Sequence, residues 1–125
     1  GAWINNSRLR VSQRNHLEGS MFATGVQIKH PDILSRGIAQ ASHLLHQTSV
    51  RIMGSAALDL ANVASGKFDG FWASRLNLWD IIAGMILVKE AGEFVKTCKA
   101  KTSIRWKMKL SSPPVPPLAK NSNKI

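Results

Sequence analysis

The chain has 125 residues, enough for one domain, and 44% of them are hydrophobic, which allows a real core. Its single cysteine, Cys98, excludes an internal disulfide. The net charge of +10 is concentrated at one end: residues 96–125 carry eight Lys/Arg and no acid, whereas residues 1–95 carry nine basic and seven acidic side chains. Because the first 95 residues are nearly neutral, the chain does not belong to the class of nucleic-acid-binding proteins that are basic along their whole length.

Strand and helix patterns alternate along the first 95 residues. The predicted strands cover residues 1–12 (a hairpin around Asn5-Asn6), 20–28, 50–53, 68–72 and a last segment from 93. The predicted helices cover residues 31–45, 56–65 and 80–92. This alternation predicts an α/β fold.

The pattern ends after Val95. Residues 97–109 scatter cations among isolated apolar residues without a helix or strand period, and residues 111–117 form a proline-rich break. We therefore predict two regions, an α/β region over 1–95 and a poorly ordered basic tail over 96–125. No apolar run reaches the roughly 18 residues of a membrane-spanning helix and no N-terminal targeting pattern is present, so we expect a cytoplasmic setting.

One carboxylate stands immediately before an almost wholly apolar run of helical length. Asp80 is followed by residues 81–88, which are apolar apart from Gly84. Near a helix start, an acid interacts favourably with the positive end of the helix dipole. The local sequence alone allows two interpretations: Asp80 only caps the first turn, or it binds a ligand at the rim of a buried helix.

Four motifs in this chain resemble those of one enzyme family. The run Leu78 to Gly92 is similar to the C-terminal Trp-Asp signature of the inositol monophosphatase family. Residues 1–12 resemble its Gly-Ala…Val-Ser hairpin, Gly54 to Gly66 its substrate-side turn and helix, and 68–72 the strand that follows. Order and spacing agree from Gly1 to about Val95. The resemblance implies the C-terminal half of a layered α/β sandwich and a Mg-dependent phosphatase of small phosphate monoesters, typically an inositol phosphate.

The resemblance also implies roles for individual residues. Asp80 would ligate a catalytic Mg ion and lie near the substrate, and Gly54, Ser55 and Ala56 would line the substrate side. Trp79 would be wedged beneath Asp80 or packed in the core. A homodimer is common in the family, so we expect a homodimer or a complementing N-terminal half as partner.

Most of the family's acidic metal motifs do not occur in this sequence. Asp69-Gly70 does not replace them, because it lacks the preceding Asp-Pro and aligns with a strand. Hydrolysis of a phosphate monoester needs several carboxylates to hold Mg, and one aspartate cannot do this alone. We therefore expect a truncated enzyme with no complete catalytic set, inactive on its own.

Two departures from the family pattern bear on the site. Ala73 stands where the family commonly has a Glu that binds sugar hydroxyls, so that role is not assigned here. Ile82 replaces a small residue, which predicts a larger group in a tight place.

Other functions are left as alternatives. A non-catalytic remnant or interaction module is the second hypothesis, and non-specific nucleic-acid binding through the basic tail is the third. His43 and His46 lie three residues apart on a predicted helix, but no Cys or acid flanks them, which favours a solvated helix face over a metal site.

Overall fold

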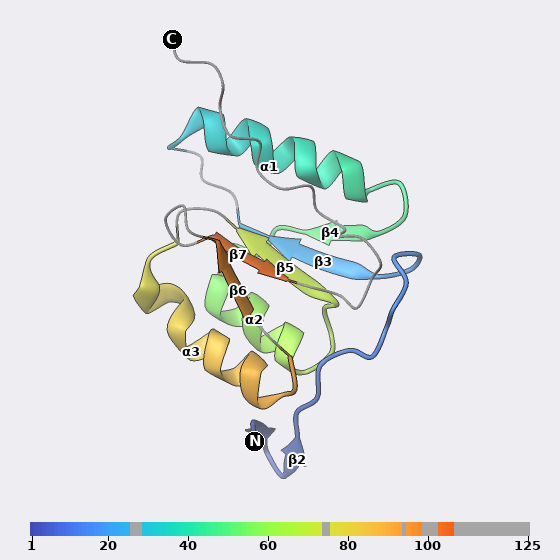
Figure 1. Ribbon diagram of the computed structural model, residues 1–125, viewed down its shortest axis with the longest axis vertical. Coiled ribbons are helices and arrows are strands. Elements are labelled where there is room, and N and C mark those ends of the chain that lie inside the picture. The colour runs from blue at the N-terminus through green and yellow to red at the C-terminus, as the bar shows by residue number, and fades with distance from the viewer. Residues whose placement is uncertain (26–28, 74–75, 94, 99–102, 107–125) are drawn as a thin grey trace.

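The computed structural model describes residues 1–25, 29–73, 76–93, 95–98 and 103–106, which form two sheets and three helices (Figure 1). The smaller sheet is the hairpin of β1 (Trp3–Ile4) and β2 (Ser7–Arg8). The larger sheet has the order β4 (Ser49–Arg51), β3 (Met21–Thr24), β5 (Gly70–Ala73), β7 (Ser103–Trp106), β6 (Val95–Cys98). β3, β4 and β5 are parallel, and β7 is antiparallel to both of its neighbours.

Helices cover both faces of the larger sheet (Figure 1). α1 (Pro31–Leu44) lies on one face, and α2 (Ala56–Ala64) and α3 (Leu78–Glu90) lie together on the other. The predicted α/β class is therefore confirmed. Within the described residues, none of the helices combines the length and the apolarity needed to cross a membrane.

The core lies between the sheet and the α2/α3 layer. Phe71 of β5, Leu60 of α2 and Ile81 of α3 are each fully buried. α3 is apolar almost all the way round, yet only one side of it is buried. On the other side of α3, Leu78, Trp79, Ile82 and Ile86 are each 47–78% exposed.

Local sequence signals set most of the element ends. Asn5 takes a left-handed φ of 50° in the hairpin turn, with Trp3 opposite Arg8, which confirms the predicted hairpin. Pro31 opens α1, as the missing N–H of proline favours. Gly92 follows α3 with a φ of +108°, a conformation that glycine adopts readily.

Two expectations are wrong. Residues 103–106 form β7, a strand between β5 and β6, although the sequence there shows no strand period. The position of β7 comes from backbone pairing with two neighbours, which local periodicity does not reveal. Ile82 is 47% exposed, so it does not crowd a tight place among the described residues. Residues 107–125 of the predicted tail lie outside the described residues.

Candidate functional site

The carboxyl ends of β3, β4 and β5 meet at one edge of the sheet. Ala23 of β3 is opposite both Arg51 of β4 and Phe71 of β5. α2 begins shortly after β4 ends, and α3 begins shortly after β5 ends. Open α/β sheets bind their ligands at this edge. The segments before α2 and α3 are therefore the candidate binding segments.

The turn into α2 offers backbone donors at this edge. Gly54 has a φ of +84°, and a Cβ added there would meet nothing within 4 Å. Ser55 is the N-cap, and its Oγ accepts a hydrogen bond from the Leu58 N–H at 3.3 Å. Because the first N–H groups of a helix have no partner inside the helix, those of Ala56 and Ala57 can serve an anion or a hydroxyl. Gly54, Ser55 and Ala56 therefore lie at a helix start with free backbone donors, and their substrate-side role stays a prediction.

Asp80 lies in the first turn of α3, at the positive end of its dipole, and its side chain is exposed. Asn77 is the N-cap and makes no side-chain capping bond. Asp80 is therefore a first-turn acid rather than the N-cap, and its carboxylate faces outward.

One predicted environment of Trp79 is wrong. The side chain is 78% exposed, so it is not packed in the core of the described residues, and its place beneath Asp80 stays a prediction. The physical reason lies in the orientation of α3: Ile81, Gly84 and Val88 face inward, and Trp79 falls on the opposite side of the helix.

The fold brings the two candidate segments to the same edge without a direct polar contact. α2 and α3 pack side by side, with Leu60 of α2 against Gly84 of α3. Both helices begin at the carboxyl edge because each follows one of the parallel strands. Among the described residues, no hydrogen bond or ion pair joins Asp80 to the Gly54–Ala56 turn.

The residues that the structure describes do not fit a magnesium site by themselves. Magnesium takes six oxygen ligands in near-octahedral geometry and is commonly held by more than one carboxylate or by substrate phosphates. No group of three or more His, Cys, Asp or Glu residues gathers in the described part of the chain. Asp80 can supply only one carboxylate, so further ligands have to come from elsewhere.

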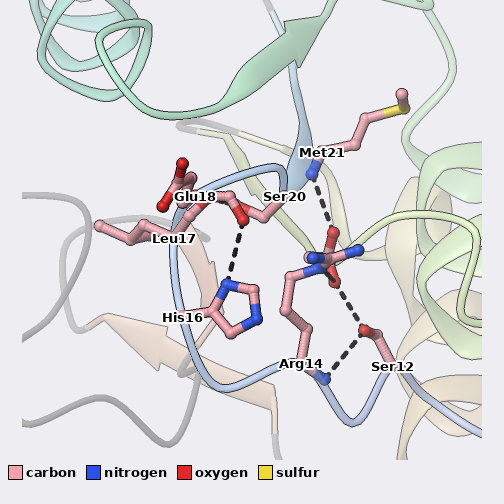
Figure 2. Close-up of polar contacts among 8 residues, drawn as sticks. Ser12, Arg14, His16, Leu17, Glu18, Ser20 and Met21 are labelled. Atoms are coloured by element: carbon pink, nitrogen blue, oxygen red, sulfur yellow. Dashed lines mark hydrogen bonds and ion pairs between the residues drawn. The ribbon is translucent and has the colours of Figure 1, made fainter.

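The carboxylate of Asp69 is bound by neighbouring residues of the chain. One carboxylate oxygen accepts a hydrogen bond from Ser12 Oγ at 2.6 Å and lies 3.3 Å from Arg14 Nε. The other accepts the Met21 N–H at 2.8 Å. These three partners, Ser12, Arg14 and Met21, lie beside the 16–20 turn (Figure 2). Asp69 therefore ties the segment after the hairpin to the start of β3.

Comparison with known proteins decides the family. The model of the inositol monophosphatase family matches residues 1–121. The chain belongs to the inositol monophosphatase family. The inositol-1-monophosphatase of Rhizobium meliloti (strain 1021) is 41% identical over 93 residues, and the Nus factor SuhB of Pseudomonas aeruginosa is 44% identical over 98 residues. The predicted boundary at residue 96 stays a prediction.

Solved structures of the family share the fold. The inositol monophosphatase from Anabaena (Nostoc) sp. PCC 7120 superposes with a TM-score of 0.69 at 37% identity, covering 77% of this chain and 43% of that one. The suhB protein of Bartonella henselae gives a TM-score of 0.72 at 36% identity, covering 82% and 42%. The Rhizobium and Pseudomonas relatives are covered over 35% and 36% of their length, from 74% and 76% of this chain. The chain thus spans well under half of these family members.

Sequence reasoning missed one buried acid in this family member. Asp59 of α2 is only 1% exposed, and its Oδ1 has no hydrogen-bond partner. Burial raises the pKa of Asp59 from 3.8 to about 6. The signal was present in the sequence, because Asp59 lies four residues before Val63 on the buried face of the helix. An acid on that face loses its contact with water when the helix packs into the core, which disfavours its ionised form.

The carboxyl edge also holds a small cavity between α1 and the sheet. Its volume is about 40 Å³, and its lining is mostly apolar. The lining residues are Thr24, Gly25, Leu34, Gly37, Ile38, Ala41 and Ile52. This space suits a water molecule or a methyl group rather than a sugar phosphate. The cavity is therefore not a candidate for the binding of a sugar phosphate.

Proposed function

We propose that this chain provides the substrate-side edge of a phosphatase that hydrolyses small phosphate monoesters, with an inositol phosphate as the expected substrate. The observation that carries the proposal is the placement of the Gly54–Ala56 turn and Asp80 at the carboxyl edge of the same parallel strands. Membership of the inositol monophosphatase family supplies the reaction class.

The proposed roles follow from the groups at that edge. The free N–H groups at the start of α2 would bind hydroxyl or phosphate oxygens of the substrate. Asp80 would supply one oxygen ligand to magnesium, which in phosphatases neutralises charge on the transferring phosphoryl group. The remaining ligands would come from a family segment that this chain does not span. We therefore propose that the 125-residue chain alone is inactive.

Phosphate release tests this directly. The purified chain is incubated with inositol monophosphate and Mg, alone and after co-expression with the unmatched portion of the Rhizobium meliloti relative. We expect no turnover from the chain alone and Mg-dependent turnover from the pair, lost on Asp80→Asn. Turnover by the chain alone that disappears with Asp80→Asn would contradict the proposal.

A non-catalytic interaction module remains the alternative from another class. It predicts association of the pair without any turnover. We place either form in the cytoplasm, as the single cysteine suggests. A homodimer, as expected for the family, would appear as twice the chain mass in solution.

Nucleic-acid binding through the basic end is a third candidate. Residues 96–125 carry eight Lys/Arg and no acid. One relative of this chain, from Pseudomonas aeruginosa, has the name Nus factor SuhB. Binding by charge alone predicts an affinity for any RNA that falls steeply with salt. Replacing Lys107, Lys109, Lys120 and Lys124 by Gln should reduce that salt dependence. An unchanged salt slope would exclude this candidate.

A further inference from the structure

Asp59 is the first buried residue of α2. The residues that precede it, from Met53 to Leu58, are exposed or half-buried, whereas Asp59 and Leu60 are 1% and 0% exposed. Within that stretch only Ala56 packs against the hydrophobic core, and its side chain is a single methyl group. The first turn of α2 is therefore held on the core mainly by the side chain of Asp59.

Backbone hydrogen bonds connect Asp59 to the turn that precedes α2. The Asp59 N–H donates to the Ser55 carbonyl at 2.9 Å, and the Leu58 N–H donates to Ser55 Oγ at 3.3 Å. Gly54, before this cap, has a φ of +84° and open space around it. Leu60, directly after Asp59, is packed tightly against α3. A movement of the first turn is therefore confined between the flexible Gly54 and the fixed Leu60.

Within the described part of the chain, the carboxyl group of Asp59 has no cation beside it. Its Oδ1 is buried without a hydrogen-bond partner. β3 and β5, which pack against α2, carry no titratable side chain, and the titratable residues of α3, which are Asp80, Lys89 and Glu90, are all exposed. Burial therefore raises the pKa of Asp59 to about 6. Short of global unfolding, the ionised carboxylate regains water when the first turn of α2 leaves the core.

We infer that Asp59 is a positioning residue for the substrate-side turn: in its protonated form it holds the first turn of α2 on the core, and in its ionised form it releases this turn together with Gly54–Ala56. The link to substrate rests on the proposed function, whereas the movement itself requires no substrate. Because the closed turn presents the N–H groups of Ala56 and Ala57, its release disperses these donors. The candidate substrate edge is thus well formed in acid and loosened as the pH rises through about 6.

Amide hydrogen exchange of the full chain tests this movement without any phosphatase activity, so it can fail independently of the proposed function. The readouts are the protection factors of the Leu58 and Asp59 amides, which both bond to Ser55, after correction for the intrinsic effect of pH on exchange. Both should fall by about tenfold or more between about pH 4 and pH 7.5, because opening of the turn is linked to ionisation of Asp59. At each pH both should exchange faster than the Val88 amide of α3, which reports global unfolding.

Two variants assign the pH effect to one carboxyl group. Asp59→Asn cannot ionise and should keep both protection factors constant over this range. Asp32→Asn, at the exposed acid in the first turn of α1, is the matched control and should leave the fall in place. If Asp59→Asn does not fold, an NMR titration of the Asp59 carboxyl carbon in the parent chain takes its place. The fall in protection should then level off as that carboxyl group completes its ionisation.

Three results would overturn the inference. Constant protection of the Leu58 and Asp59 amides in the parent chain would show that the turn does not respond to pH. An undiminished fall in Asp59→Asn, or a fall that does not follow the carboxyl titration, would show that another group controls it. Protection equal to that of Val88 at every pH would show that Asp59 reaches water only by global unfolding.

Discussion

Gly84 of α3 lies directly against Leu60 of α2. A Cβ built on Gly84 would be 2.5 Å from the Leu60 Cβ and 2.6 Å from its Cδ1. Real Cβ atoms do not approach this closely, and the Cβ of Leu60 is fixed to its backbone. The two helices can pack side by side at this distance because position 84 has no side chain.

Gly84→Ala should therefore destabilise the fold. The added methyl forces α2 and α3 apart in a fully buried region, and overpacking of this kind costs about 1–3 kcal/mol. Denaturant unfolding followed by circular dichroism measures the change. A variant as stable as the parent would show that the two helices can separate without cost.

Gly37→Ala is the matched control in α1, and its effect should have the opposite sign. A Cβ at position 37 would meet nothing within 4 Å. Alanine has a higher helix propensity than glycine, which predicts a gain of about 0.5–1 kcal/mol. The same unfolding measurement checks this value, and a loss of stability would contradict the open space found beside Gly37.

The two helix starts at the carboxyl edge should respond differently to loss of their caps. Ser55→Ala removes the acceptor of the Leu58 N–H and should cost about 1 kcal/mol. Asn77→Ala should cost less, because Asn77 makes no side-chain capping bond. Parallel thermal melts of the two variants test the order, and equal losses would disagree with the capping geometry.

Asp69 should be a large contributor to stability. Asp69→Ala leaves the part-buried Met21 N–H without its acceptor and frees both Ser12 and Arg14. Losing hydrogen bonds to a buried charged acceptor predicts a cost of about 2–3 kcal/mol. Glu18→Ala, an exposed acid in the nearby turn, is the control and should change stability by less than about 0.5 kcal/mol. Similar effects of the two variants would reject the structural role of Asp69.

Because Asp59 is buried, we expect the folded state to lose stability as the pH rises. Its pKa is 3.8 ordinarily and about 6 in the folded chain, so the folded state favours the protonated form. The stabilisation by that proton is complete below about pH 3.8 and is lost as the pH rises through about 6, at an upper bound of about 3 kcal/mol.

Asp59→Asn isolates this effect. The variant cannot ionise, so its stability relative to the parent should increase between pH 4 and about pH 7.5. Asp32→Asn, at an exposed acid in the first turn of α1, is the comparison and should leave the pH dependence close to that of the parent. Unfolding curves at several pH values measure both. A constant difference between Asp59→Asn and the parent across this range would refute the raised pKa.

Much of the fold could be predicted because its signals are local. Asn5 in a hairpin turn, Pro31 at a helix start and Ser55 as a cap each act through their own backbone geometry or a partner three residues away. The family motifs then located Asp80 and the Gly54–Ala56 turn, and the structure brings both to one edge. Their roles in binding stay predictions.

The rest depends on contacts between distant segments. The hydrogen bonds of Asp69 join it to residues 48 and 57 positions away, which no local pattern specifies. β7 is defined by its two neighbours in the sheet. A tryptophan in an apolar run suggests burial, so the sequence led to a prediction of core packing for Trp79. The direction in which Trp79 faces is instead fixed by the packing of Gly84 on Leu60.

The sheet order has a consequence for synthesis on the ribosome. β6 reaches β5 only through β7, which comes later in the chain. During translation, β5 and β6 therefore emerge before the strand that connects them exists, and the unpaired side of β5 is left open in the meantime. A nascent chain halted near residue 98 would expose that side to chaperones or to neighbouring chains, and the last step of sheet completion would wait for residues 103–106 to leave the exit tunnel.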